Sequence, residues 1–251
     1  MIMAMAVLSA VLFSCVREEM TCDKELIVVQ RIGEGGYVYT RGTVISSNTD
    51  LKEETFGLYG SLTPNASVPQ PYFNASATVN ADLTATISPL QYWPGLLNAS
   101  MKFFSWYPYS DANAPTASFT DPGEMVLNYT ANESAANHVD VLAAISGPIW
   151  VEGVNIHFYH TLTKVTFTFK KVAPVPDEVI IEKIEFQNVG KSGKLAMTEI
   201  PTTTTKNGKP KFVWSDVATG KVVSTLTDNK TVTEDATLMG DTFLMLPTDA
   251  F

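Results

Sequence analysis

The stretch from residue 138 to 171 constrains the fold of this chain more than any other. It holds two strongly apolar segments, Val139–Ile145 and Asn155–Phe169, on either side of the turn-forming Ser146-Gly147-Pro148. A period of two residues predicts a β-strand with one buried face. In the second segment the apolar residues follow two phases, first Ile156, Phe158 and Leu162, then Val165, Phe167 and Phe169. The phase change predicts one long strand with a bulge or kink, because the core residues would otherwise turn to solvent.

The rest of the chain also predicts short strands. Their candidate ranges are Leu26–Gln30, Tyr37–Ser46, Thr55–Leu62, Tyr72–Val79, Leu83–Ser88, Met101–Pro108, Met125–Tyr129, Val179–Asn188, Phe212–Trp214, Lys221–Leu226 and Thr242–Leu246. Long apolar patterns with helical spacing are absent, and Gly or Pro interrupts the chain at short intervals. This pattern favours an all-β sandwich fold over α/β.

Three connecting segments have specific interpretations. We expect Ser146–Gly153 to be a hinge between domains and Ala112–Thr120 to be a polar loop. Val189–Lys194 resembles a phosphate-binding loop, but the glycine required five residues before Gly190 is replaced by Glu185. A turn between two strands is therefore the better interpretation of that segment.

The chain has 251 residues, which is enough for two domains. We expect a signal peptide and tether over residues 1–22, an N-terminal β-sandwich over 23–150 and a C-terminal one over 151–251. The second sandwich is expected to be incomplete, because the sequence stops at Phe251, just after the apolar segment Phe243–Leu246.

The overall charge argues against one class of partner. Asp and Glu number 26 against 17 Lys and Arg, which gives a formal net charge of -9. Nucleic-acid binding requires a positive surface to contact phosphates. We therefore expect no nucleic-acid partner.

The N-terminus has the features of an export signal. Met1–Ser14 is apolar throughout, and as a helix it would extend only about 21 Å, which is short of the roughly 30 Å hydrocarbon core of a bilayer. A signal peptide fits better than a membrane anchor. Leu12-Phe13-Ser14-Cys15 resembles a bacterial lipobox, in which the cysteine is lipidated and becomes the mature N-terminus. The charged Val16-Arg17-Glu18-Glu19 that follows resembles a surface-export tag of Bacteroidota lipoproteins.

Aromatic residues concentrate in the first half of the chain, in Tyr92-Trp93-Pro94 and in Met101–Pro108. Alternate rings are expected to fill the core of a sandwich, since aromatic residues are favoured in strands. The alternative is a sugar-stacking platform that includes Trp93, Trp106 and Tyr107.

No motif in the sequence points to a catalysed reaction. His157 and His160 are three residues apart on one predicted strand, so they face opposite sides and cannot chelate one ion together. No serine lies in a G-x-S-x-G setting. We therefore expect no enzymatic activity, no cofactor and no metal, and a glycosidase built from unpaired carboxylates ranks last.

Four segments in order resemble the Bacteroidota fimbrillin family, the precursors of type V pili. They are Thr40-Arg41-Gly42-Thr43, Tyr92-Trp93-Pro94 with Phe103–Pro108, Asp140-Val141-Leu142-Ala143, and Phe158–Phe167, which is similar to a family segment F-x-H-x-L-x-K-x-x-F. The resemblance implies two transthyretin-like β-sandwich domains and a lipidated precursor at the outer membrane. It also implies that a neighbouring fimbrial subunit donates a strand to a groove opened by proteolysis.

The resemblance implies that this chain is a structural or adhesive subunit of a cell-surface fimbria. The partners that it implies are other fimbrial subunits, the outer membrane and a host glycan or protein receptor. The alternative is a surface lipoprotein that binds glycans through exposed aromatics and does not polymerise.

The family's maturation protease is trypsin-like and cuts after an arginine. The candidates outside the tether are Arg31 and Arg41. We favour Arg31, because it follows the strand Leu26–Gln30 and precedes the glycine-rich Gly33–Gly36, where the backbone is expected to be accessible. Arg41 competes because it lies in the first family segment, although it falls within a predicted strand.

Overall fold

The computed structural model describes residues 25–34, 45–121, 123–150, 153–172, 178–197 and 212–247. These residues form thirteen β-strands and two single-turn 3₁₀ helices, η1 (Pro64–Ala66) and η2 (Ala135–Asn137). The expected all-β class is confirmed.

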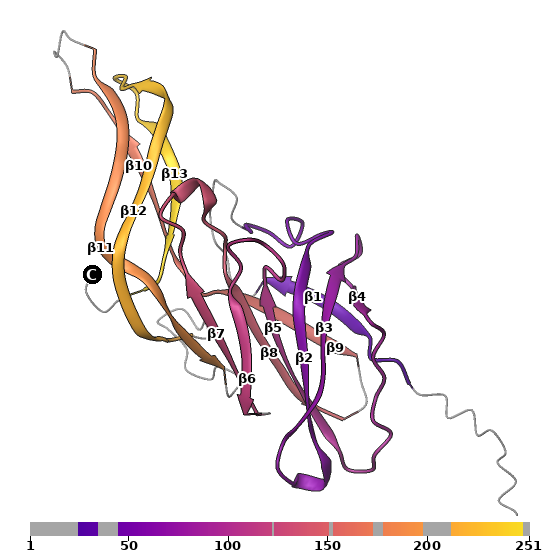
Figure 1. Cartoon of the computed structure of the whole chain (residues 1–251). Helices are drawn as coiled ribbons and strands as arrows, with labels where there is room; N and C mark the ends of the chain where they lie inside the picture. The colour runs from indigo at the N-terminus through magenta and orange to yellow at the C-terminus, as the bar shows by residue number, and fades with distance from the viewer. Residues whose placement is uncertain are drawn as a thin grey trace, which may run out of the picture.

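Seven strands form a closed barrel in the order β1-β4-β3-β2-β5-β8-β9 (Figure 1). Their bounds are β1 (Val29–Glu34), β2 (Thr55–Thr63), β3 (Gln70–Val79), β4 (Ala85–Ser88), β5 (Ser100–Tyr107), β8 (Leu142–Ile149) and β9 (Val154–His160). All neighbouring pairs are antiparallel except β1 and β9, which are parallel.

The other six strands form two further sheets. A four-stranded sheet has the order β12-β11-β7-β6, and β10 pairs with β13 alone. Their bounds are β6 (Thr116–Asp121), β7 (Glu124–Thr130), β10 (Thr163–Phe169), β11 (Ile180–Met197), β12 (Trp214–Thr231) and β13 (Thr237–Met245). Figure 1 shows that the long strands β11 and β12 extend from the side of the barrel to the far end of an elongated molecule.

Three apolar clusters follow the length of the molecule. The first fills the barrel, the second lies between the barrel and the β6-β7-β11-β12 sheet, and the third lies between β11, β12 and the β10-β13 pair. Neighbouring residues of β5 belong to two different clusters, Phe103 to the first and Phe104 to the second. When the two faces of a strand are each buried in a different core, the strand lacks the simple alternation of polar and apolar residues.

The expected long bent strand over Asn155–Phe169 is wrong in one respect. The structure divides it into β9, which lies in the barrel, and β10, which pairs with β13. Ile156 and Phe158 are buried in the first cluster, whereas Val165 and Phe167 pack against the third. The change of phase therefore marks the point where the chain leaves one sheet for another.

The three connecting segments also differ from expectation. Ser146–Ile149 continues β8 and is not a hinge, and most of the expected loop Ala112–Thr120 belongs to β6. Val189–Lys194 is not a turn, because it lies inside β11 at a series of bulges in its pairing with β12. Bulges admit glycine within a strand without ending it.

The expected pair of transthyretin-like sandwiches is not confirmed, since a seven-stranded barrel-like sheet takes the place of the first. The hairpin β6-β7 comes between β5 and β8 in sequence but pairs with β11. Strand β9 lies beyond residue 150 but pairs with β8 and β1. The division at residues 150 and 151 remains a prediction.

Candidate functional site

Strand β1 closes the barrel and is the candidate site for strand exchange. On one side it runs parallel to β9, in a register from Val29 opposite Val154 to Glu34 opposite Phe158. This parallel pair is the exception among the barrel's antiparallel pairs, and parallel pairing is slightly less stable per residue.

On its other side β1 is joined to β4 at one register position, Val29 opposite Ala85. A backbone hydrogen bond from Ile32 N–H to the Leu83 carbonyl adds to it, with an N···O distance of 2.8 Å. The segment before β1 is also held by backbone bonds, from Ile27 N–H to Gln91 and from Trp93 N–H to Glu25.

Buried side chains add to the attachment of β1. Ile27, Val29 and Ile32 are buried in the first apolar cluster, while Val28 and Gln30 face outward. Full burial of such a side chain stabilises a fold by about 1.5–3 kcal/mol. The spacing of the three residues breaks the period of two between Val29 and Ile32, because the register with β9 shifts between Val29 and Arg31.

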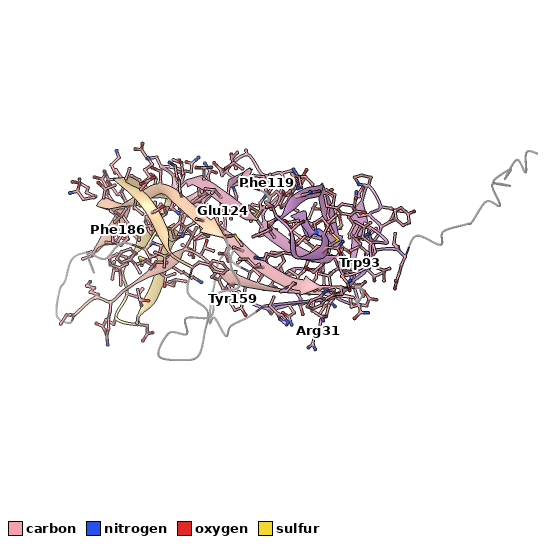
Figure 2. The ribbon with its side chains drawn as sticks, turned by 90° about the horizontal axis from the view of Figure 1, so that it is seen from below. Arg31, Trp93, Phe119, Glu124, Tyr159 and Phe186 are labelled. Atoms are coloured by element: carbon pink, nitrogen blue, oxygen red, sulfur yellow. The ribbon has the colours of Figure 1, made fainter. Side chains whose placement is uncertain are left out.

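This bulge exposes Arg31, which projects away from the ribbon in Figure 2. The strand was expected to end at Gln30, but it continues through Glu34, so Arg31 lies within β1 and not after it. The expectation that Arg31 lies in an accessible glycine-rich turn is therefore wrong: its side chain is exposed, but its backbone lies in the ladder with β9, opposite Asn155. Arg41 and Cys15 lie outside the described residues.

Removal of β1 would uncover a groove suited to another strand. The flanking strands β4 and β9 would present unpaired backbone N–H and C=O groups, and the barrel interior would present Ile87, Ile156 and Phe158. A strand that enters such a groove gains backbone hydrogen bonds and fills pockets with alternate side chains. The geometry supports binding of an extended peptide.

A second cluster of polar groups lies where the chain leaves the barrel. The buried Asp140 pairs with the partly buried His160, with His160 Nδ1 at 2.9 Å from Asp140 Oδ2 and 3.1 Å from Oδ1. Thr161 follows His160, and both its N–H (3.1 Å) and its Oγ1–H (2.7 Å) donate to the Val141 carbonyl. Two of the segments that carry the family resemblance therefore meet here.

Two further side chains connect this cluster to its surroundings. Trp214 of β12 donates its indole N–H to the Thr161 carbonyl at 2.7 Å. Tyr107 donates its hydroxyl to Glu54 Oε2 at 3.0 Å. Burial raises the pKa of Tyr107, and the carboxylates of Glu54, Asp140 and Asp111 raise it further, so this side chain stays a neutral donor.

The three aromatic residues considered for glycan contact lie in or beside the core. Trp93 is in the barrel cluster, where it makes an edge contact with Phe103, and Trp106 is in the second cluster. Tyr107 is half-buried. Because both indoles are enclosed by protein, neither offers a ring face to a sugar, and the structure removes the support for that interpretation.

The histidines do not form a shared site either. His157 is exposed on β9, whereas His160 pairs with Asp140. Across the described ranges, no group of three or more His, Cys, Asp or Glu side chains could hold a metal ion. Within the same ranges, no helix is long and apolar enough to cross a membrane.

Sequence reasoning missed two features of the site. It did not find the pairing of Asp140 with His160, although both residues lie in segments that were singled out. It also did not find that β1 pairs with β9, because contacts between distant strands leave no periodic pattern in the sequence. The signal for the bulge that the sequence did offer was the uneven spacing of the apolar residues Ile27, Val29 and Ile32.

The architecture defines an all-β protein in which β1, the first strand of the described residues, completes a barrel. The model of the fimbrillin-like family matches residues 40–251. The chain therefore belongs to the fimbrillin-like family, as its sequence segments predict. Membership makes it a structural protein that associates with other fimbrial subunits at the cell surface. No curated protein and no solved structure matches the chain significantly.

Proposed function

We propose that this protein is a fimbrial subunit that assembles by accepting a strand from a neighbouring subunit in the groove occupied by β1. The observation that carries the proposal is the position of β1, which comes first among the described strands and closes the barrel through a parallel pair with β9. Because the other described strands all follow β1 in sequence, a cut after β1 does not interrupt any of them. The buried residues Ile27, Val29 and Ile32 indicate what a replacement strand would have to supply.

The two candidate cleavage sites would have different consequences. A cut after Arg31 would release Ile27 and Val29 but leave Ile32–Glu34 paired with β9. A cut after Arg41 would release all of β1. The exposed side chain of Arg31 favours a cut there, whereas its place in the paired strand β1 opposes it. The start of the family match at Thr40 supports a natural boundary beside Arg41. Both sites stay candidates.

The test is limited digestion of the folded full-length chain with an arginine-specific protease. N-terminal sequencing is expected to give Ile32 or Gly42 as the new first residue, with polymers appearing afterwards by electron microscopy. The Arg31→Ala/Arg41→Ala double variant should keep β1 and stay monomeric. Arg17→Ala is the matched control, because it removes the arginine before β1 and should assemble like the wild type. Equal assembly of the double variant and the wild type would refute strand removal at these sites.

Binding of a peptide to the groove can be measured separately from polymerisation. A synthetic peptide of residues 25–34 should bind the cleaved protein and not the intact one, since β1 already fills the groove. A Val29→Asp peptide should lose this binding, because the carboxylate would enter the barrel core. A Val28→Asp peptide is the control, since Val28 faces outward. Binding of all three peptides to intact and cleaved protein alike would show that no specific groove exists.

We also propose that the precursor is lipidated at Cys15 and anchored to the outer membrane. The apolar run Met1–Ser14 and its lipobox-like end support this. Cells that express the wild type should incorporate a labelled fatty acid into the protein, and cells that express Cys15→Ser should not. Equal label on both would exclude this anchor.

A further inference from the structure

One end of the barrel, which we call the Leu97 end, gathers exposed apolar side chains. Four segments meet there, namely 25–28 before β1, 63–71 between β2 and β3, 89–100 between β4 and β5, and 147–150 at the end of β8. Their proximity follows from pairing, because Leu26 bridges to Tyr92, Thr63 lies opposite Ser100, and Met101 lies opposite Ile149. Figure 1 shows η1 and the β4–β5 connection at this end, and Figure 2 shows Trp93 there.

The apolar character of the Leu97 end is pronounced. Its exposed large apolar side chains include Leu97 at 87%, Val68 at 76% and Trp150 at 60% of full exposure. The others are Leu26, Val28, Leu90, Tyr92 and Leu96. Monomeric proteins rarely gather exposed apolar residues in this way without a binding partner.

The same segments are almost without charge. Across residues 25–28, 63–71, 89–100 and 147–150, Glu25 is the single Asp, Glu, Lys or Arg, although Lys24 and Glu152 adjoin them in sequence. The loops at the opposite end of the barrel contrast with this, since they contain Asp50, Lys52, Glu53, Glu54 and Asp82. A partner of the Leu97 end is therefore recognised by apolar contact and not by charge.

We infer that the Leu97 end docks on a lipid surface while the protein is anchored through its N-terminus. The described chain begins at this end, where the Glu25 carbonyl accepts a hydrogen bond from Trp93 N–H. Glu25 is ten positions after Cys15 in the chain, and ten fully extended residues span at most about 33–36 Å. A lipid on Cys15 therefore keeps this end of the barrel close to the membrane. This step rests on the lipid anchor proposed above.

The exposed side chains of the Leu97 end suit a lipid surface. Trp and Tyr are enriched where a bilayer meets water, because their rings are apolar with a polar tip. Leu and Val side chains enter the boundary between headgroups and acyl chains. The four segments themselves carry no Lys or Arg, so we expect the contact to depend little on anionic lipids and on salt.

Trp150 provides a direct test, because the other three tryptophans, Trp93, Trp106 and Trp214, are buried. The lipidated full-length protein is bound to phosphatidylcholine vesicles whose acyl chains carry bromine, which quenches tryptophan fluorescence at short range. We expect a quenched, blue-shifted component of the tryptophan fluorescence. This component should be absent in Trp150→Phe and unchanged when the salt concentration is raised. The Val68→Asp/Leu97→Asp variant should lose the quenching, because charge at these positions opposes insertion.

The matched control is Val172→Asp/Val213→Asp, which places the same charges at exposed apolar sites outside the barrel and should be quenched like the wild type. Fatty-acid label on vesicle-bound protein without quenching of Trp150 would overturn the docking but not the anchor. Quenching without label would uphold the docking and reject the anchor. Self-association that is lost in Leu97→Asp, with Trp150 unquenched, would overturn the docking and assign this surface to a second copy of the chain.

Discussion

His138 is buried in a neutral form beside the third apolar cluster. Its Nδ1 accepts a hydrogen bond from Leu244 N–H at 2.9 Å, and its Nε2–H donates to the Asn132 carbonyl at 2.8 Å. Burial lowers the pKa of His138 below its ordinary value of 6.5, an effect that Lys191 adds to and that Asp241 and the bond to Asn132 oppose. The folded state therefore disfavours the second proton, which the unfolded chain accepts freely.

This pKa shift predicts a loss of stability in acid. The contribution of His138 is fully present above pH 6.5 and decreases as the pH falls below it, because the unfolded state then binds the extra proton more readily. We expect His138→Gln to lower the free energy of unfolding by about 1–3 kcal/mol at pH 7.5, since two buried partners lose a well-placed hydrogen bond. The difference between the wild type and the variant should be smaller at pH 5, as measured by urea denaturation at both pH values.

His157→Gln serves as the control for this measurement. His157 is exposed on β9, so its replacement should change the stability by no more than about 0.5 kcal/mol. If His138→Gln has the same pH dependence as the wild type, the neutral buried histidine is not the cause of the acid sensitivity.

At the scale of secondary-structure elements, bulges allow the long strands β11 and β12 to contribute side chains to two apolar clusters. β11 and β12 have 18 residues each, and their register shifts at four places along β11. Ile184 thereby packs in the third cluster, and Leu195, further along the same strand, packs in the second. Gly193 allows a close approach, because a Cβ there would lie 2.7 Å from Leu246 Cδ2. Gly193 therefore serves packing within a strand and not a turn.

At the scale of the whole molecule, the pair Asp140–His160 fixes the place where the chain passes from the barrel to β10. The next residue, Thr161, is bound by Val141 on one side and by Trp214 of the second sheet on the other. The junction therefore links the barrel to the four-stranded sheet through hydrogen bonds as well as through the second apolar cluster.

We predict that Asp140→Asn lowers the free energy of unfolding by about 1–3 kcal/mol, because a buried charged partner of His160 is lost. Hydrogen exchange should quicken first at Thr161 and at the start of β10, since these residues depend on the junction. Urea denaturation and amide exchange measured by mass spectrometry provide the two readouts.

Asp216→Asn is the matched control for Asp140→Asn. Asp216 pairs with Lys194 at 3.1 Å, but both side chains are more than half exposed, so the same chemical change should cost less than about 1 kcal/mol. Equal losses in the two variants would contradict a structural role for the buried pair at the junction.

The sequence by itself determined the all-β class, the position of most strands and the family. The candidate ranges Thr55–Leu62, Tyr72–Val79 and Met101–Pro108 located β2, β3 and β5 within one or two residues, because strand-favouring residues bounded by turn residues are a local property of the sequence. The order of four segments along the chain indicated the family, which the match over residues 40–251 confirmed.

Only the tertiary structure decided which strands pair. Segments Asn155–His160 and Thr163–Phe169 look like one strand in sequence, but their partners lie more than a hundred residues apart, at β1 and at β13. The candidate groove and the Leu97 end were likewise revealed only by the tertiary structure. The residues of the Leu97 end come from segments scattered between Glu25 and Trp150. Pairing depends on backbone hydrogen bonds that every residue type can make, so the side-chain pattern specifies a strand without specifying its neighbour.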